Sequence, residues 1–280
     1  MKITRRRFVA LGATAALAVG LTACGGSDST TGSSGSGAGG LKIGIKIDQP
    51  GLGLKQGSDY TGMDIDVARY VAGKLGTAAD KITWVPAPSA QRETLIETGQ
   101  VDLVVGTYSI TDARKQKVSF AGPYFIAGQD LLVRADEASI TGPESMTGKK
   151  LCSVKGSTSA QKVKDKYPGV NLQEFGTYSE CVAALVSKGV DALTTDNTIL
   201  AGYAAQAQYK GKLKVVGKTF SEERYGIGLK KGDTALCQKV TDAVNAMIKD
   251  GAWQKAVDAN LGPAGFKPGA GNPPTPDACA

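Results

Sequence analysis

Apolar and polar residues along this chain change their spacing from segment to segment, and the segments predict strands and helices in turn. Residues 41–47 alternate apolar side chains with glycine and lysine, which predicts a strand, whereas residues 64–75 place apolar side chains at helical spacing. Strands and helices that alternate are typical of an α/β fold with parallel strands. The same patterns predict strands at 82–85, 101–105, 150–154 and 190–193, and helices at 89–98, 112–116, 158–166, 179–188 and 197–207.

Hydroxyl and carboxylate residues stand at the expected starts of three helices. Thr111 precedes the helix at 112–116, Thr158 and Gln161 form a capping-box pattern, and Asp196 precedes the last of the helices above. Side-chain oxygens at such positions accept hydrogen bonds from the first backbone N–H groups of a helix. We therefore expect Thr111, Thr158 and Asp196 to be capping residues.

An internal echo indicates two similar lobes. Residues 95–103 and 185–193 both run from a leucine through a glycine and a Val-Asp pair into a predicted strand. The pattern is common in α/β proteins, so chance stays an alternative explanation. In open α/β sheets ligands bind beyond the carboxyl ends of the strands. Two facing lobes of this kind would form a binding cleft.

The first 23 residues have the features of an export signal. Basic residues precede an apolar stretch from Phe8 to Leu21 that is short for a permanent membrane span. The stretch ends in Leu-Thr-Ala-Cys at Cys24, which resembles the lipobox in which bacterial lipoproteins are acylated. Residues 5–7 also resemble a twin-arginine signal, so the export route stays open. Residues 24–40, rich in Gly and Ser, are predicted to be a lipidated, flexible linker that reaches roughly 20–25 Å from the outer face of the cell membrane.

Composition excludes several functional classes. The chain has 280 residues, 41% of them hydrophobic, which is enough for a buried core. Removing the four basic residues of the export segment lowers the formal net charge from +7 to +3, which is too mild for a nucleic-acid-binding protein. The chain contains no histidine, which excludes Ser-His-Asp triads, Cys-His pairs and HExxH zinc sites. No metal or other cofactor is indicated.

The cysteines beyond Cys24 predict two disulfides. They number four, an even count that is typical of proteins outside the cytoplasm. Three pairings are possible, and free thiols are the alternative. We favour Cys152–Cys181 and Cys237–Cys279, because each pair closes a local loop within one predicted lobe. A loop of about 30 residues closed in this way stabilises the fold by roughly 3–4 kcal/mol.

Two polar junctions could bind the charged groups of a small ligand. Residues 106–114 follow a predicted strand and end in Arg114, whose guanidinium can bind a carboxylate through two hydrogen bonds. Residues 155–159 open a predicted helix, where free N–H groups favour an anion. Ordinary helix capping would explain each junction alone. Together with Asp196, they could bind both the carboxylate and the ammonium of an amino acid.

Several motifs occur in a fixed order along the chain, namely Gly62–Ala68, Arg92–Asp102, Ser109–Arg114 and Phe120–Tyr124. As a set they resemble the polar amino-acid-binding proteins of ABC importers, and the resemblance covers residues 41–261, nearly the whole mature chain. A smaller set consists of Cys152–Thr158, Thr195–Asp196 and Tyr225–Lys231. This set resembles the glutamate-binding lipoproteins of Gram-positive bacteria.

The resemblance implies an α/β, two-lobed, type II periplasmic-binding-protein-like fold. Residues 41–125 with 221–280 would form one lobe and residues 126–220 the other. Two crossings, near 125–129 and 219–222, would form the hinge. The chain would be a monomeric, non-enzymatic receptor that delivers an amino acid to an ABC permease and, through it, to an ATPase.

The resemblance also implies roles for individual residues. Arg114 would bind the α-carboxylate, and Asp196 would bind the α-ammonium together with the Thr107 carbonyl. Asp48 would line the pocket. Ser109, Thr158 and Ser159 would assist Arg114.

The expected side-chain subsite lacks aromatic residues and contains cations. Relatives that bind apolar or cationic side chains often stack them between two aromatic rings, where this chain has Gly51 and Ser89. Arg92 and Lys46 lie nearby in the sequence, with Lys155 as a third candidate. These features favour glutamate, or aspartate, as the ligand. The alternatives are a solvated surface role for these cations, glutamine or another polar amino acid as ligand, and a sensor or a dehydratase on the same scaffold.

Overall fold

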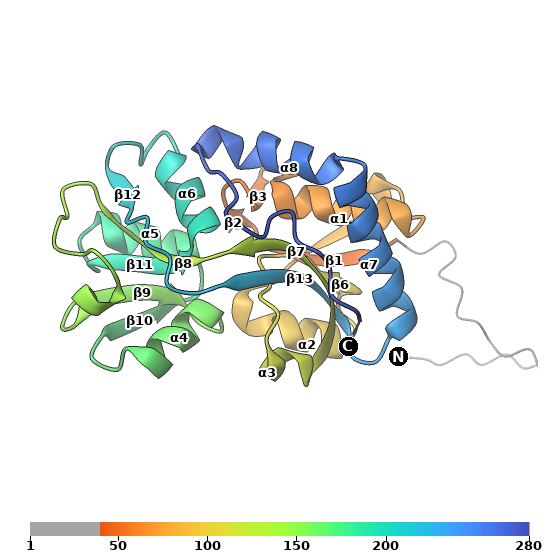
Figure 1. The fold of residues 1–280 in the computed structure, drawn as a ribbon, viewed down its shortest axis with the longest axis horizontal. Coiled ribbons are helices and arrows are strands. Elements are labelled where there is room, and N and C mark those ends of the chain that lie inside the picture. The colour runs from red at the N-terminus through yellow and green to blue at the C-terminus, as the bar shows by residue number, and fades with distance from the viewer. Residues whose placement is uncertain (1–39, 280) are drawn as a thin grey trace, which may run out of the picture. The chain divides into compact units, whose positions relative to one another are not determined.

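The computed structural model describes residues 40–279 (Figure 1). The predicted export signal, Cys24 and nearly all of the predicted linker lie outside the described residues. Within them, no helix is long and apolar enough to span a membrane.

The first of two five-stranded sheets has the order β5-β1-β6-β13-β7. Strand β1 runs parallel to β5 and β6, whereas β13 runs antiparallel to β6 and β7. We call this sheet and the helices on it the first lobe. Its strands are β1 (Lys42–Ile45), β5 (Thr83–Pro86), β6 (Leu103–Val104), β7 (Val118–Ala127) and β13 (Glu223–Lys230), joined by the small antiparallel sheet β2 (Asp48–Gln49), β3 (Gly53–Gln56) and β4 (Asp59–Thr61).

The second sheet has the order β10-β9-β11-β8-β12 and, with its helices, forms the second lobe. Strand β9 runs parallel to β10 and β11, whereas β8 runs antiparallel to β11 and β12. The two lobes therefore repeat one plan, three parallel strands followed by two antiparallel pairings. The strands are β8 (Gln129–Arg134), β9 (Lys150–Val154), β10 (Asn171–Phe175), β11 (Ala192–Asp196) and β12 (Leu213–Val215).

Helices cover both sheets (Figure 1). In the first lobe, α7 packs on β7 and against α1 and α8, and in the second lobe α4, α5 and α6 pack on β11. Their apolar faces bury the core between helix and sheet. The helices are α1 (Met63–Lys74), α2 (Arg92–Glu97), α3 (Asp112–Lys115), α4 (Thr158–Lys166), α5 (Tyr178–Val186), α6 (Asn197–Ala205), α7 (Thr234–Lys249) and α8 (Ala252–Asn260).

The chain crosses between the lobes where the predicted hinges lie. Strand β7 ends at Ala127 in the first sheet, and β8 begins at Gln129 in the second. The return crossing leads from β12 through residues 216–222 into β13. The expected lobe boundaries at 125 and 220 stay a prediction.

Long strands that the sequence pattern did not predict form the middle of the molecule. Nine of the ten residues of β7 are buried, as are all but the last residue of β8. Strands covered on both faces have no polar side to alternate with, so period-two patterning cannot reveal them. The strand predicted at 41–47 is shorter in the structure, where β1 spans Lys42–Ile45. Asp48 belongs to the next strand, β2.

Of the three predicted helix caps, Thr111 is confirmed, Thr158 is wrong, and Asp196 has the predicted position without the capping hydrogen bond. Thr111 does cap α3, accepting a hydrogen bond from the Arg114 backbone N–H at 3.3 Å. At α4 the cap is Ser157, which accepts from the Ala160 N–H at 3.0 Å, and Thr158 is the first helical residue. Asp196 occupies the N-cap position of α6 without a capping hydrogen bond. Its carboxylate is used elsewhere.

Both predicted disulfides are present. Cys152 in β9 bonds to Cys181 in α5, and Cys237 in α7 bonds to Cys279 near the C-terminus. The second bond holds the irregular tail that follows α8 against β7, where Asp277 pairs with Gly122. The tail thereby covers the strand that leads into one of the crossings.

Candidate functional site

Loops from both lobes meet where the strands of each sheet end. The loop after β6 carries Thr107 and Ser109, and the loop after β9 leads into α4 at Thr158. Ser109 Oγ and Thr158 Oγ1 lie 3.3 Å apart, so the lobes are in contact here. Each of these loops is a junction that the sequence singles out. We call this region the interlobe site.

Arg114 is held by polar groups of both lobes. Its Nε pairs with the Glu93 carboxylate at 3.1 Å, and its Nη atoms donate to the carbonyls of Ser109 at 2.8 Å and of Gly156 at 3.0 Å. The side chain is buried, and its guanidinium lies 5.0 Å from the ring centroid of Tyr108. An arginine has five N–H donors, so two stay available for a ligand carboxylate.

Lys46 and Arg92 belong to the first lobe and are buried, with 5% and 2% of their surface exposed. Lys46 Nζ donates to Ser89 Oγ at 2.7 Å, and Arg92 Nη1 donates to the carbonyls of Gly106 and Thr107. Arg92 Nε is buried without an acceptor. Among residues 40–279, neither side chain has a carboxylate within salt-bridge distance.

The electrostatics of these two cations favour an anion beside them. Burial, and then the charge of Arg92, lowers the pKa of Lys46 to about 7. Burial, and then the charge of Arg114, lowers the pKa of Arg92 to about 10. Both causes disfavour the charged form. A carboxylate placed between Lys46 and Arg92 would relieve both.

Thr107 is fixed in a strained conformation by a buried acid. Its φ is +43°, in the left-handed region. Its backbone N–H donates to Asp64 Oδ2 at 3.0 Å, and Tyr124 donates to the other oxygen of Asp64 at 2.8 Å. Asp64 is fully buried, and burial raises its pKa to about 6. This support sets the direction of the Thr107 carbonyl.

Asp196 lies in the second lobe and faces the crossing strand β13. Tyr225 donates its hydroxyl to Asp196 Oδ2 at 2.7 Å, and Ser159 Oγ lies 3.5 Å from Oδ1. Burial, and then the nearby charge of Glu223, raises the pKa of Asp196 to about 7. A ligand ammonium would offset both effects.

Asp48, which the sequence predicts to line the pocket, is bound to the start of a helix of the second lobe, and from there its charge acts to raise the pKa of Lys46. Its Oδ2 accepts hydrogen bonds from the backbone N–H groups of Tyr178 at 3.0 Å and Ser179 at 3.2 Å, the first turn of α5. Tyr203 also donates to Asp48. An anion at a helix N-terminus is stabilised by the helix dipole. Asp48 thus links the two lobes.

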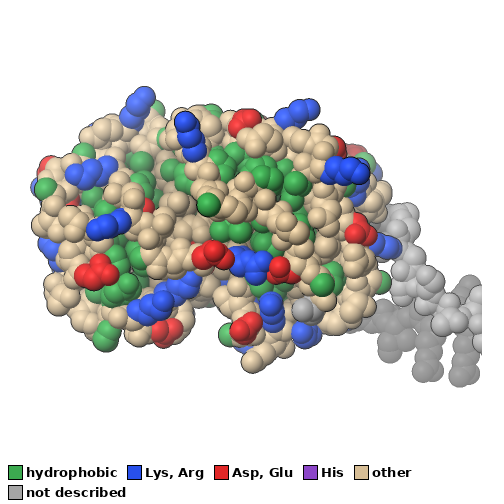
Figure 2. Space-filling view, in the orientation of Figure 1, with side chains coloured by type: hydrophobic (Ala, Val, Ile, Leu, Met, Phe, Trp, Pro, Cys, Tyr) green, Lys and Arg blue, Asp and Glu red, His purple; other side chains and the backbone are tan. Residues whose placement is uncertain are grey.

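A cavity of about 450 Å³ opens beside Arg114. Figure 2 shows the molecule hollowed where α4 and β10 face α2 and α3, with acidic and basic side chains bordering the hollow. Lys155 is exposed on this cavity, so the structure gives it a surface position. The residues that line the cavity are Ser89, Ala90, Glu93, Ala113, Arg114 and Lys117 from the first lobe and Lys155, Gly156, Lys164 and Glu174 from the second.

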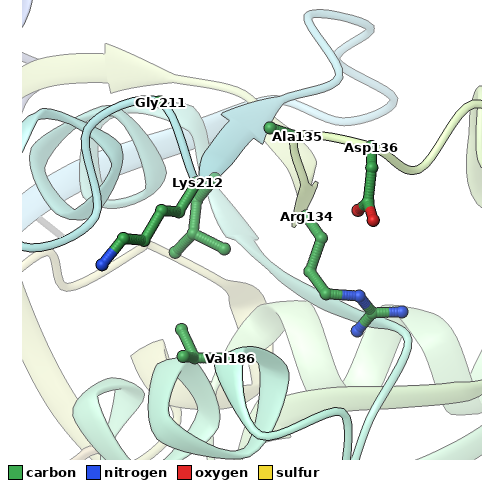
Figure 3. Close-up of a pocket in the computed structure, with 7 residues that line it drawn as sticks. Arg134, Ala135, Asp136, Val186, Gly211 and Lys212 are labelled. Atoms are coloured by element: carbon green, nitrogen blue, oxygen red, sulfur yellow. The ribbon is translucent and has the colours of Figure 1, made fainter.

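A second hollow of about 320 Å³ belongs to the second lobe alone (Figure 3). Arg134 and Lys212 line it, together with the exposed apolar side chain of Val186. The Arg134 guanidinium already donates to the carbonyls of Leu185 and Val190. None of the residues that the sequence singles out lines this hollow. The interlobe site is therefore the better candidate.

Within residues 40–279, no three His, Cys, Asp or Glu side chains are grouped as metal ligands would be.

Sequence reasoning missed three residues of the interlobe site, namely Glu223, Asp64 and Glu93. Glu223 is 1% exposed and accepts four side-chain hydrogen bonds. The sequence did contain a signal for Glu223. It precedes Tyr225 by two residues, and residues two apart on a strand lie on the same face of the sheet, so this spacing indicates that Glu223 lies near Tyr225. Asp64 lies within the motif Gly62–Ala68, but nothing in that motif indicates its role. Glu93 had no signal apart from its place next to Arg92.

We predict that Gly156→Ala prevents the contact between the lobes. Gly156 has φ of +77°, and an added Cβ would lie 2.6 Å from Ala90 Cα in the first lobe. Ligand affinity should fall at least about tenfold, since a clash of this kind opposes closure. Calorimetric titration with the ligand measures the change.

Gly211→Ala is the matched control. Gly211 has φ of +75°, and an added Cβ meets nothing within 4 Å. It carries the same backbone strain without the clash. Equal affinities for the two variants would contradict the prediction.

Known proteins are similar to this chain over most of its length. The bacterial extracellular solute-binding proteins, family 3, match residues 41–263. The glutamate-binding protein GluB of Corynebacterium glutamicum is 50% identical over 90% of this chain and 89% of the relative. The glutamine-binding protein GlnH of Bacillus subtilis is 37% identical over 77% of this chain and 78% of the relative. The structure of an ancestral arginine-binding protein bound to glutamine is 36% identical, with a TM-score of 0.74 over 79% of this chain and 97% of that structure. These matches confirm the predicted fold class.

Proposed function

Because this chain belongs to the bacterial extracellular solute-binding proteins, family 3, we propose that it captures L-glutamate between its lobes and delivers it to an ABC importer. The relatives matched here are named for the amino acids that they bind, and the GluB protein, at 50% identity, is named for glutamate. We further propose that the chain acts as a receptor without catalytic activity. Aspartate and glutamine are the competing ligands.

One observation carries the choice of an acidic ligand. Lys46 and Arg92 are both buried, the charge of Arg92 lowers the pKa of Lys46, and neither side chain has a carboxylate within salt-bridge distance among residues 40–279. Buried charges in proteins are normally paired. The side-chain carboxylate of glutamate would supply a paired anion, whereas the amide of glutamine would leave both cations with only the more distant charges of Asp48, Asp64 and Glu93.

The zwitterionic end of the ligand would bind at the other groups. Arg114 would take the α-carboxylate with its two remaining N–H donors. The first backbone N–H groups of α4, at Thr158 and Ser159, would assist, since a helix leaves them without an acceptor. Asp196 and the Thr107 carbonyl would take the α-ammonium, because a carbonyl that already accepts from Arg92 retains a second lone pair. Ligand binding would then stabilise the contact between the lobes.

The deciding experiment is calorimetric titration of the mature, ligand-stripped protein with L-glutamate, L-aspartate, L-glutamine and L-arginine. We expect the tightest binding with L-glutamate. Heat with L-arginine alone would rule out the acidic ligand, and heat with none of the four would rule out the whole class. Loss of glutamate uptake on deletion would separate a transport role from a sensory one.

We predict that the affinity for L-glutamate is highest near pH 7. A ligand carboxylate favours charged Lys46, whose pKa is about 7, so the affinity should fall as the pH rises above that value. A ligand ammonium favours ionised Asp196, whose pKa is also about 7, so the affinity should fall as the pH decreases below it. The expected slope on either side is up to about tenfold per pH unit. Dissociation constants measured from pH 5.5 to 8.5 check the profile.

Lys46→Met provides the control for this profile. In this variant the affinity should no longer fall as the pH rises above 7, but it should still fall as the pH decreases below 7. An affinity for the wild-type protein that does not change between pH 6 and 8.5 would contradict the prediction.

We also propose that the protein is a monomer anchored to the outer face of the cell membrane by lipid on Cys24. The lipobox-like end of the apolar segment supports this, and residues 24–40 would serve as the tether. Mass spectrometry of the mature N-terminus should find an acylated cysteine. Release of a Cys24→Ala variant into the medium would support the anchor, and retention of that variant at the membrane would oppose it.

A further inference from the structure

Glu223 is a buried acid to which neither the sequence nor the proposed function gives a role. It is the first residue of β13, at the return crossing between the lobes, and is 1% exposed. Its Oε1 accepts from Lys162 Nζ at 2.5 Å and Ser221 Oγ at 2.9 Å. Its Oε2 accepts from Ser109 Oγ at 2.7 Å and Thr158 Oγ1 at 2.9 Å. Both oxygens are therefore fully used by protein donors.

The two hydroxyls on Oε2 come from different lobes. Ser109 belongs to the first lobe and Thr158 to the second, and their oxygens are 3.3 Å apart. A hydroxyl has one proton and two lone pairs. When both protons are donated to Glu223, both hydroxyls can only accept a further hydrogen bond. A ligand carboxylate cannot donate one, whereas an ammonium can.

The surroundings of Glu223 favour an ammonium as well. Tyr225 follows Glu223 by two residues on β13 and donates its hydroxyl to Asp196 at 2.7 Å. Two buried carboxylates, those of Glu223 and Asp196, thus act on the same part of the interlobe site. Lys162 is the one cation that pairs with them among the described residues. The α-ammonium of a ligand would bring the charge of this group close to zero.

We propose that Glu223 is a positioning residue that orients the hydroxyls of Ser109 and Thr158 as acceptors for the α-ammonium of the ligand. This proposal rests on the proposed function. It changes the role expected from the sequence, in which these two side chains assist Arg114 at the α-carboxylate. Their backbone N–H groups are still available for that carboxylate.

The test is a double-mutant cycle on the full mature protein with L-glutamate as the probe. Glu223→Gln keeps the shape of the side chain but offers an N–H₂ group to one of the hydroxyls. We expect it to weaken binding about 10- to 100-fold. In a background that carries both Ser109→Ala and Thr158→Ala, the same change should weaken binding at least about threefold less than it does in the wild-type protein, because the part of its effect that acts through these hydroxyls is then absent.

A pH profile supplies a readout that a purely structural role would not move. Removing the charge of Glu223 should shift the acid side of the affinity profile to lower pH, since that charge helps to hold the proton on Asp196, which also faces Tyr225, Ser159 and Arg92. Glu144→Gln, which changes an exposed acid of the second lobe that lines neither hollow, is the control and should change neither readout.

The outcomes separate the two proposals. A wild-type protein that does not bind L-glutamate refutes the proposed function. A wild-type protein that binds it, with additive losses in the cycle or an unshifted acid side, refutes the role of Glu223 alone. Thermal unfolding of the ligand-free variants identifies any that fail to fold. Glu223→Asp, which retains the charge, then replaces such a variant and should retain the acid side of the wild-type profile.

Discussion

Replacing Arg114 by alanine is expected to remove measurable binding of every amino acid tested. The guanidinium is the buried cation shared by both lobes, and it pairs with Glu93 and with the Gly156 carbonyl. Truncating one partner of a buried, hydrogen-bonded charge pair costs roughly 2–5 kcal/mol, or about 30- to 5,000-fold in affinity. The loss should be similar for L-glutamate and L-glutamine, because both carry the same α-carboxylate. Calorimetric titration with each ligand measures it.

Arg134→Ala is the matched control for this loss. Arg134 is a partly buried arginine that also donates to backbone carbonyls, but it lines the hollow of the second lobe in Figure 3. Its replacement should leave the affinity within about twofold. Retained binding by the Arg114 variant, at wild-type strength for any of these amino acids, would show that Arg114 does not grip the shared end of the ligand.

Removing the buried cations should change selectivity rather than abolish binding. Lys46→Met and Arg92→Met are each expected to weaken L-glutamate about 10- to 100-fold, since hydrogen bonds to charged groups contribute roughly 1.5–3 kcal/mol. The affinity for L-glutamine should fall less than about fivefold, because its side-chain amide carries no charge that interacts with these two cations. The ratio of the two dissociation constants is the measurement.

Lys55→Met is the control for the second prediction. Lys55 lies on β3 close to Lys46 in sequence, but its side chain is exposed. It should leave the ratio unchanged. Equal losses for L-glutamate and L-glutamine in the Lys46 and Arg92 variants would show that these side chains do not recognise the ligand's side-chain charge.

The interlobe site would have two parts with different functions. Arg114 and Asp196 would bind the groups that all amino acids share, whereas Lys46 and Arg92 would select among them. Burial makes the charged forms of Lys46 and Arg92 unfavourable unless an anion lies beside them, and it lowers the pKa of Lys46 to about 7. This need for an anion would be the source of selectivity. A site of this kind discriminates because a neutral ligand leaves its charges without partners.

Much of the fold could be predicted from local patterns. The alternation at 41–47, the helical spacing at 64–75 and the Val-Asp echo indicate an α/β fold with two similar sheets, and the fold class is confirmed. The disulfides could be predicted because an even number of cysteines with local spacing leaves few pairings. The strands β7 and β8 were missed, since burial on both faces removes the alternation that identifies a strand.

The sequence alone excluded the catalytic and metal sites that need histidine, and it predicted a site for a zwitterion from an arginine and an aspartate that follow predicted strands. Only the tertiary structure decided which partner each polar side chain takes. Asp48 bonds α5, 130 residues away, and Glu223 binds Ser109 from 114 residues away. The physical reason is that periodicity reports the neighbours along a strand or helix, whereas a side chain's hydrogen bonds depend on how distant elements pack.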